Sequence, residues 1–544
     1  MTMKRALAIS STYIVASSVC PASAFSQSRL LRTDGALFKV SSGDSYCRLE
    51  RLANDEPGRR KRSLALASSI FGEESRSSKN SETAPSTPSK SKTTLAAVAS
   101  DALDGTSDGS RGLVAGYADV ASAALLITGN TVGASMMVLP SVAAGPGMIP
   151  SAGLFLGLYA VNLISGLLLA EVAIEQKEMT GVDAPSSFKQ FAAHNLGCES
   201  TARFVSAVSI FVNSCILTFD LTRAGQFASA RLPEALGAGS VECTAALATG
   251  LVALVATQTD RSLSRFASVT VGVLFVSFAG FLLPGLASMD PSAALLAPGS
   301  AGDDGASDVI GSLSTAAPVF LTTMVYQNIV PSVTKILDYD RTKTTFAIIA
   351  GSFLPLVMYL AFCYAALGGG LDVSSAGSGP LFAAFAAASL AGSAVASLMS
   401  LAEEYGNNLP LASEDGAEIL KSGKGQDQES TKGKVASLPS VVLAGLLPMC
   451  ACLALANGGE PTAALSTAGS YGSPLLYGVL PVAMVWNQRR DRARTAQDGY
   501  TRDEGDLVPG GASSLVLLGA GALLFVLENI ERDIGGVLAA IGMS

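Results

Sequence analysis

The stretch Gly129-Asn130-Thr131-Val132-Gly133-Ala134-Ser135 lies inside an apolar segment and is poorly suited to an unbroken helix. Its glycines allow non-helical backbone, and its Asn, Thr and Ser side chains can replace the backbone hydrogen bonds that a break removes. At membrane depth, irregular backbone is tolerated where it lines a cavity inside the protein. Gly129 and Gly133 also fit the small-xxx-small pattern of helix packing, so this stretch alone leaves both interpretations open.

A second apolar segment repeats the interruption, with Thr322-Thr323-Met324-Val325-Tyr326-Gln327-Asn328 at its centre. In both segments eight residues separate a threonine from a Pro-Ser pair: Thr131 from Pro140-Ser141, and Thr322 from Pro331-Ser332. Paired interruptions five spans apart are typical of transporters built from two inverted five-helix repeats. Freed amides at the start of a half-helix can bind a carboxylate, and freed carbonyls can bind an ammonium group.

The whole chain has the composition of an integral membrane protein. Of its 544 residues 49% are apolar and 15% are charged, whereas soluble domains carry about 25% charged residues. From Ala115 onward we expect about 11 apolar spans, each of roughly 18–25 residues and long enough to cross about 30 Å of hydrocarbon. Their predicted centres are Gly133, Gly157, Phe211, Gly250, Phe275, Thr322, Leu356, Leu390, Leu446, Leu475 and Leu518.

Basic residues alternate between the predicted loops. The loops after even-numbered spans carry most of them: Lys177, Lys189, Arg261, Arg265, Lys335, Arg341, Lys343, Lys421, Lys424, Lys432, Lys434, Arg489, Arg490, Arg492 and Arg494. The loops after odd-numbered spans carry Arg223 and Arg231 and almost no others. The positive-inside rule therefore predicts that the even-numbered loops share one side, with the mature amino terminus on that cytoplasm-like side.

The first part of the chain has a different composition. Residues 1–24 are interpreted as a signal peptide, with Lys4 and Arg5 before a short apolar core and an Ala22-Ser23-Ala24 cleavage site. Residues 25–112 are predicted to form a disordered transit or linker segment. The transporter domain is expected over 113–530, and a short tail over 531–544.

The junction Ala22-Ser23-Ala24-Phe25 resembles the two-part presequences of algae with complex plastids. This resemblance implies an inner envelope membrane of the plastid (chloroplast). Secretion to another endomembrane or to the plasma membrane is the alternative, and acidic residues such as Asp34 and Asp44 are unusual in a transit peptide.

The two interrupted segments carry a family resemblance. Gly129 to Pro140, Leu167 to Val172, Phe188 to Gly197 and Ala317 to Ser332 resemble motifs of the tryptophan/tyrosine permease family. This is a family of hydroxy and aromatic amino acid permeases in the amino acid-polyamine-cation superfamily. The resemblance runs roughly from Ala118 to Arg490, and it implies an all-α, leucine-transporter-like fold with 11 spans, of which the first and sixth are broken.

The resemblance also implies proton-coupled transport of tyrosine or tryptophan, across a plastid envelope if the targeting prediction holds. This chain departs from the family pattern at Val325-Tyr326-Gln327, where bacterial members tend to have Gly-Phe-His. It also has Met399 about where bacterial members have an acidic residue. These changes leave the cargo open to serine or another neutral amino acid, and they remove candidate proton carriers.

Site residues are predicted on both breaks. The backbone around the first break would bind the amino-acid group, Tyr326 would stack on an aromatic side chain, and Gln327 would bond a polar atom. The complete predicted set is Gly129, Asn130, Thr131, Gly133, Ala134, Ser135, Phe320, Thr322, Thr323, Tyr326, Gln327 and Asn328.

Two acidic residues within the spans need a separate interpretation. Glu171 is the proton-coupling candidate, because a charged group within a span is costly and often functional. The alternative is that it is paired or solvated beside Glu175 at the membrane edge. Asp220 and Arg223 are one helical turn apart, and we expect them to form a structural pair.

Other classes of protein fit the sequence less well. A membrane-embedded enzyme would need a clustered nucleophile, base or metal set, yet the chain has one histidine and no HExxH or GxSxG motif. A sensor would normally need a sizeable soluble output domain after the spans. We therefore expect no catalytic residue, metal or cofactor, and as partners an amino acid, protons and membrane lipid, with no nucleic acid.

Overall fold

The computed structural model describes residues 29–33, 36–43, 46–52, 108–232, 239–258, 260–296, 305–371, 379–408, 438–455, 460–497, 506–509 and 511–541. The chain divides into two compact units, residues 1–92 and residues 93–544. The predicted signal peptide, residues 1–24, lies outside the described residues.

The first unit contains a small antiparallel sheet of strands β1 (Arg29–Thr33), β2 (Ala36–Gly43) and β3 (Tyr46–Leu52), in that order. Thr33 pairs with Ala36, and Gly43 pairs with Tyr46, so both connections are short. The three strands lie within residues 25–112, for which the composition predicts a disordered transit or linker segment.

The second unit is helical throughout its described elements. In chain order these are α4 (Asp108–Thr131), η1 (Ala134–Val138), α5 (Leu139–Ala144), α6 (Met148–Thr180), α7 (Phe188–Leu196), α8 (Glu199–Ser229), α9 (Ser240–Thr257), α10 (Asp260–Ser288), α11 (Pro291–Leu296), α12 (Gly305–Thr323), η3 (Gln327–Ile329), α13 (Val330–Ile336), α14 (Arg341–Leu367), α15 (Pro380–Asn408), α17 (Leu438–Leu455), α18 (Thr462–Thr467), η6 (Ala468–Gly472), η7 (Pro474–Val479), α19 (Leu480–Gln497) and α20 (Gly511–Ile541).

The helices of the second unit confirm the predicted all-α integral membrane fold. Among the described residues nine helices are long and apolar enough to cross a membrane, and the bent pair Ala118–Thr131 and Ala134–Ala144 makes a tenth span. These ten correspond to predicted spans one to nine and eleven. The segment around Leu475 is helical as well, but its π-helical stretches η6 and η7 divide it into short elements. At its end α20 continues to Ile541, past the predicted domain boundary at 530.

Side-chain contacts gather the loops after even-numbered spans at one end of the bundle. Asp183, after α6, forms ion pairs with Lys177 and with Lys335 at the end of α13. Lys189 donates to the Asn407 carbonyl at the end of α15. Arg489 of α19 pairs with Glu171 near the end of α6. Four of the loops predicted to share a side therefore do so, and the alternation of spans is confirmed for them.

The opposite end joins loops after odd-numbered spans. The Asp290 amide, after α10, donates to the Gly368 carbonyl after α14 at 2.9 Å. Arg532, near the end of α20, donates to the Ser314 carbonyl in the first half of α12 at 2.7 Å. The interrupted segments therefore run in opposite directions relative to these ends, since α4 starts at the first end and α12 at the second.

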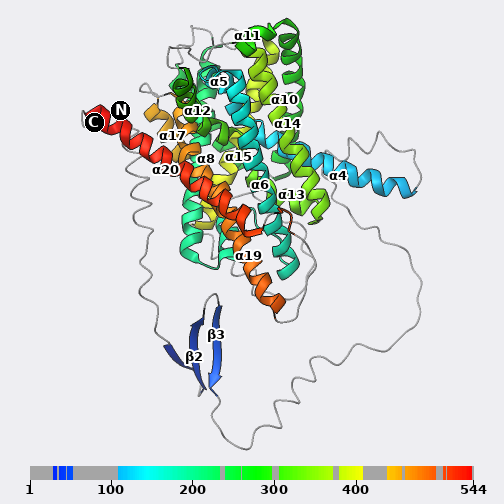
Figure 1. The fold of residues 1–544 in the computed structure, drawn as a ribbon, viewed down its shortest axis with the longest axis vertical. Helices are drawn as coiled ribbons and strands as arrows, with labels where there is room; N and C mark the ends of the chain where they lie inside the picture. The colour runs from blue at the N-terminus through cyan, green and yellow to red at the C-terminus, as the bar shows by residue number, and fades with distance from the viewer. Residues whose placement is uncertain are drawn as a thin grey trace, which may run out of the picture. The chain divides into compact units, whose positions relative to one another are not determined.

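Four spans form the centre of the bundle. Helix α8 is the most buried span, followed by the α12–α13 span, α14 and α15, whereas α9 and α20 are largely exposed. Helix α15 packs along both α8 and α10, and α14 packs along α4 and α6. Figure 1 shows α6, α8, α14 and α15 running together through the bundle, with α20 slanting across its outside. The exposed apolar faces of the outer helices, with residues such as Val276 and Leu517, suit contact with lipid.

Cys198 offers a direct test of the predicted orientation. It lies just before α8, at the end that carries the even-numbered loops, and its side chain is exposed. Hydrogen bonds from Thr201 and Ser200 lower the pKa of the Cys198 thiol to about 7. Because the thiolate is the reactive form, a membrane-impermeant maleimide should label Cys198 from the cytoplasm-like side, with a rate that rises through neutral pH.

The Cys198→Ser variant is the control and should lose this labelling. The other exposed described cysteine, Cys450, lies within the α17 span, which a charged reagent does not enter. Labelling of Cys198 only from the opposite compartment would contradict the orientation that the basic residues predict.

Candidate substrate-binding site

The first break separates α4 from α5. Helix α4 ends at Thr131, Gly133 has extended backbone with φ −105° and ψ −173°, and η1 leads into α5. The two halves of the span are bent by 52°. The φ of Gly133 is one that any residue adopts, so only the space around it distinguishes glycine from other residues there. A Cβ at this position would lie 3.3 Å from the Ser393 hydroxyl.

The second break has the same construction. Helix α12 ends at Thr323, three residues intervene, and η3 leads into α13. A proline stands in the first turn of each second half-helix, at Pro140 and Pro331. The residues before these half-helices have nearly the same backbone, with φ −96° and ψ −9° at Val138 and φ −99° and ψ −4° at Ile329. Both interrupted segments are therefore broken helices, as the sequence predicts.

Two hydrogen-bonded contacts join the breaks to each other. The Asn130 amide donates to Asn328 Oδ1 at 3.0 Å. The hydroxyl of Tyr359, on α14, lies 2.8 Å from the Thr131 carbonyl oxygen and 3.1 Å from the Thr323 carbonyl oxygen. These carbonyls belong to the last residues of α4 and α12, where the helix no longer supplies partners. One buried tyrosine therefore serves the ends of both broken helices.

A cavity of about 50 Å³ lies between the breaks and three other parts of the bundle. Its walls come from α8, α15 and the helix that contains α18 and η7. It is lined by Asn130, Thr131, Gly133, Ser135, Asn213, Ile216, Phe219, Asp220, Thr322, Thr323, Val325, Asn328, Ser393, Ala396, Ser397, Leu465 and Tyr477. The wall combines hydroxyl and amide groups with the rings of Phe219 and Tyr477.

Seven of the predicted site residues line this cavity: Asn130, Thr131, Gly133, Ser135, Thr322, Thr323 and Asn328. Gly129 and Ala134 are not in its wall, and a Cβ at Gly129 would lie 2.6 Å from a methyl group of Val271. Phe320 is also outside the wall, and its ring stacks on Phe155 with 4.0 Å between centroids.

Tyr326 and Gln327 point to helix α6 instead of the cavity. The Gln327 side chain donates to Asn162 Oδ1 at 2.6 Å and accepts from the Tyr326 amide at 2.9 Å. The Tyr326 hydroxyl donates to the Asn162 carbonyl at 3.1 Å. A Cβ at Gly166 would lie 2.4 Å from this hydroxyl, so only glycine leaves room for the tyrosine. In this conformation both residues fasten the second break to α6.

Sequence reasoning missed the contributions of α8 and α15. Asn213, Ile216, Phe219 and Asp220 come from α8, and Ser393, Ala396 and Ser397 come from α15. The predicted pair of Asp220 with Arg223 is wrong, since the Arg223 guanidinium bonds Gln226 instead. An acidic residue inside an apolar span was a usable signal for Asp220.

Glu171 lies outside the cavity wall, in an ion-pair network. Both of its carboxylate oxygens bond Arg489, at 2.8 and 2.9 Å, and the Leu507 amide donates to it at 3.1 Å. Arg492 pairs with Glu175 in the same network. The paired arrangement considered for Glu171 is therefore the one observed. A bidentate pair with Arg fixes the geometry of both side chains.

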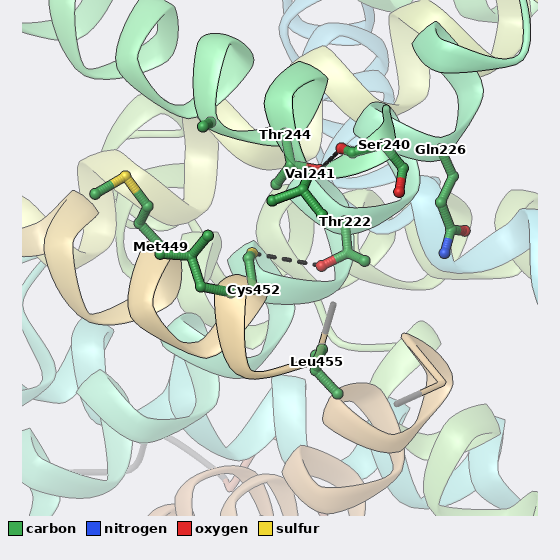
Figure 2. Close-up of a pocket in the computed structure, with 10 residues that line it drawn as sticks. Thr222, Gln226, Ser240, Val241, Thr244, Met449, Cys452 and Leu455 are labelled. Atoms are coloured by element: carbon green, nitrogen blue, oxygen red, sulfur yellow. Dashed lines mark hydrogen bonds between the residues drawn. The ribbon is translucent and has the colours of Figure 1, made fainter. Parts of the chain in front are cut away.

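A larger cavity of about 220 Å³ lies between α8, α9 and α17 (Figure 2). It is lined by Thr222, Gln226, Ser240, Val241, Thr244, Ala245, Met449, Cys452, Leu453 and Leu455. The Thr222 hydroxyl and Cys452 Sγ are 3.4 Å apart in its wall. None of these ten residues belongs to a broken helix or carries a charge. We place the candidate site in the smaller cavity, where freed backbone groups and an acidic side chain meet.

Broken helices around a shared central cavity, in a bundle of membrane-spanning helices, are typical of membrane transporters. The model of the tryptophan/tyrosine permease family matches residues 118–401, slightly more than half of the chain and including both breaks. The chain belongs to this family.

Individual relatives are more distant. The chain is 28% identical over 246 residues to a tyrosine-specific transport system 2 of Haemophilus influenzae, covering 44% of this chain and 55% of the relative. It is 27% identical over 248 residues to a tryptophan-specific transport protein of Pseudomonas aeruginosa, covering 45% of this chain and 56% of the relative. The chain thus spans about half the length of the curated relatives that it matches.

The Tyr359→Phe substitution tests the link between the two breaks. It leaves the Thr131 and Thr323 carbonyls without their hydroxyl partner, and an unsatisfied buried group costs about 1–3 kcal/mol. We expect a lower melting temperature of the purified protein and slower uptake of its substrate.

Tyr364→Phe is the matched control on the same helix. Its side chain is half-buried, and its hydroxyl makes no hydrogen bond within the described parts of the chain. This variant should behave as the unchanged protein. A Tyr359→Phe protein with unaltered melting and uptake would show that the hydroxyl does not hold the breaks together.

Proposed function

We propose that the protein is a secondary active transporter of aromatic amino acids, tyrosine or tryptophan, and that its transport is coupled to protons. The cavity between the two broken helices carries this proposal. Its freed backbone groups suit the carboxylate and ammonium groups of an amino acid. Phe219, Ile216 and Tyr477 supply apolar and aromatic surface for the side chain. Family membership and the names of the relatives support the same cargo.

The cavity must enlarge to admit such a cargo. Ligand pockets usually enclose about 300–1,000 Å³, whereas this one has about 50 Å³. The conformation described is therefore a closed one. The small hydroxyl-bearing residues Ser135, Ser393 and Ser397 in the wall favour serine or another small neutral amino acid as the second candidate cargo.

A substrate panel on reconstituted protein separates these candidates. Proteoliposomes should exchange internal for external labelled tyrosine or tryptophan, and unlabelled aromatic amino acids should compete with the label. Uptake of serine, with no exchange of any aromatic amino acid, would overturn the aromatic assignment in favour of the second candidate.

Gly133→Leu tests whether the first break is part of the transport site. The new side chain would meet Ser393 and project into the cavity wall, so we expect transport to be lost while the protein still inserts. Gly157→Leu is the control, because a Cβ at Gly157 has no neighbour within 4 Å on the exposed face of α6. Normal transport by Gly133→Leu would remove the break from the mechanism.

We also propose that the protein resides in a plastid inner envelope membrane. The Ala22-Ser23-Ala24-Phe25 junction supports this location. A fluorescent protein fused to residues 1–110 should enter the plastid of an alga that has complex plastids. Retention of the fusion in another membrane compartment, with a Phe25→Ala fusion behaving identically, would refute the location.

A further inference from the structure

Asp220 has an unusual position among the acidic residues of the bundle. It lies in the central helix α8, its side chain lines the cavity between the breaks, and only 1% of its surface is exposed. It is the one ionisable carboxyl group among the residues that line this cavity. The other well-buried acids among the described residues, Glu171, Glu175 and Glu404, all have ion-pair or hydrogen-bond partners.

The Asp220 carboxyl group is only partly satisfied. The Ser393 hydroxyl, from α15, hydrogen-bonds to it. The second oxygen, Oδ2, has no hydrogen-bond partner within the described residues. Arg223, the nearest cation along α8, bonds Gln226, and the ion pairs found among described residues do not include Asp220. The group thus combines deep burial with a free oxygen beside a cavity.

Titratable groups on the surrounding helices do not neutralise the Asp220 carboxyl group. Tyr477 of η7 lines the same cavity, and Cys452 of α17 lies near the opposite face of α8, where it contacts Thr218 and Thr222. Glu404 of α15 accepts from Ser187 and Ser206 at the far end of that helix. The remaining titratable side chains of the helices packed on α8 are Lys189 and His194 of α7, Glu242 and Cys243 of α9, Glu403 and Tyr405 of α15, Cys450 of α17 and Tyr471 of η6.

An ionised carboxylate in such a place is costly. Removing an uncompensated charge from water costs several kcal/mol, and inside a membrane such groups pair, bind protons or mark an ion pathway. Asp220 can avoid this cost in two ways: its free oxygen can hold a proton, or a cation can enter the cavity beside it.

The geometry links Asp220 to the first break. Ser393 bonds the Asp220 carboxyl, and the Ser393 hydroxyl also lies 3.3 Å from the place of a Cβ at Gly133. A change in the charge of Asp220 alters the hydrogen bond of Ser393, and Ser393 is in contact with the backbone where the amino-acid group is proposed to bind. One side chain therefore connects the acid to the substrate site.

We propose that Asp220 carries the proton that is coupled to transport. This inference rests on the proposed function. A hydronium ion on one side transfers its proton to Asp220 Oδ2, so that one O–H bond breaks as the other forms. After the cavity has changed access, the same oxygen releases the proton to water on the other side. Ser393 is a positioning residue that transmits the protonation of Asp220 to the break.

The test compares two transport modes of the Asp220→Asn protein in proteoliposomes. Accumulation driven by an imposed pH gradient requires the proton site, whereas exchange of internal for external amino acid at equal pH does not. We expect accumulation to fall at least about tenfold, within the usual range of coupling energies. Exchange should fall much less than accumulation, and its rate should lose its dependence on pH.

Three further variants sharpen this result. Asp220→Glu keeps the carboxyl group and should restore gradient-driven accumulation in part. Ser393→Ala should shift the pH at which accumulation is half-maximal. Asp119→Asn makes the same chemical change at an exposed position in the middle of α4, next to Ala118 where the membrane-crossing part begins, and should have no effect.

Gradient-driven accumulation by Asp220→Asn at the normal level would overturn the proposal. Loss of exchange together with accumulation, in a variant that inserts and melts normally, would also overturn it, since Asp220 would then be the anchor for the substrate ammonium group. The exchange assay uses the amino acid that the substrate panel identifies. An error in the proposed cargo is therefore detected with the unchanged protein, separately from any effect of the Asp220 substitution.

The protonation of Asp220 can also be measured without substrate, in case the unchanged protein exchanges no amino acid. Infrared difference spectra between acidic and alkaline buffer should contain the band of a buried protonated carboxyl group that titrates, and Asp220→Asn should lack it. An identical band in the variant would contradict the proposal, while failure of exchange alone would contradict only the proposed function.

Discussion

The hydrogen bonds of the Tyr359 hydroxyl are the constraint on which the site depends. Breaking a membrane helix frees carbonyl groups where no water is available to satisfy them, and each such group is costly. Here the two helices end with their carbonyls facing the same side chain, 2.8 Å from Thr131 and 3.1 Å from Thr323. A single hydroxyl hydrogen is shared between them, so neither end is saturated. The breaks are thereby held close together, and part of their hydrogen-bonding capacity remains for a ligand.

The polar groups on the α6 side of the second break have different hydrogen-bond partners. Gln327 occupies its donor and acceptor with Asn162 and with the Tyr326 amide, and Tyr326 fills the space that Gly166 leaves on α6. This side is complete without a ligand, whereas the side that faces α8 and α15 has the free oxygen of Asp220 and several hydroxyl groups. The asymmetry between the two sides assigns the cavity to the α8–α15 side of the breaks.

Sequence patterns predicted the features that depend on neighbours along the chain. Loop charges identified which ends meet, and the Gly129–Ser135 and Thr322–Asn328 stretches located both breaks. The same patterns could not tell which side chains enter the cavity, because a residue in a non-helical turn no longer follows the 3.6-residue period. Tyr326 and Gln327, which were predicted to face the cavity, contact α6 instead. Asp220 and Ser393 belong to helices that meet only in the folded bundle, so no spacing in the sequence brings them together. Glu171 was paired because α19 brings Arg489 to it from more than 300 residues along the chain.

Enlargement of the cavity has to come from the parts of its wall that are not regular helix. Helices α8 and α15 pack closely along each other and are joined by side-chain hydrogen bonds, such as that from the Ser206 hydroxyl to Glu404. The breaks have two or three non-helical residues each, and the wall residue Tyr477 belongs to a π-helical stretch, a form often found at functional positions. Gly469 in the neighbouring stretch touches the Pro318 carbonyl of α12 so closely that a Cβ would lie 1.8 Å from it. Because of this contact, we expect a shift of α12 to move the π-helical segment with it. The end of α12 and the π-helical segment that carries Tyr477 would then move away from α8 together. In the mechanism proposed for Asp220, the central helix would keep this residue in place while the access of its free oxygen to water changes.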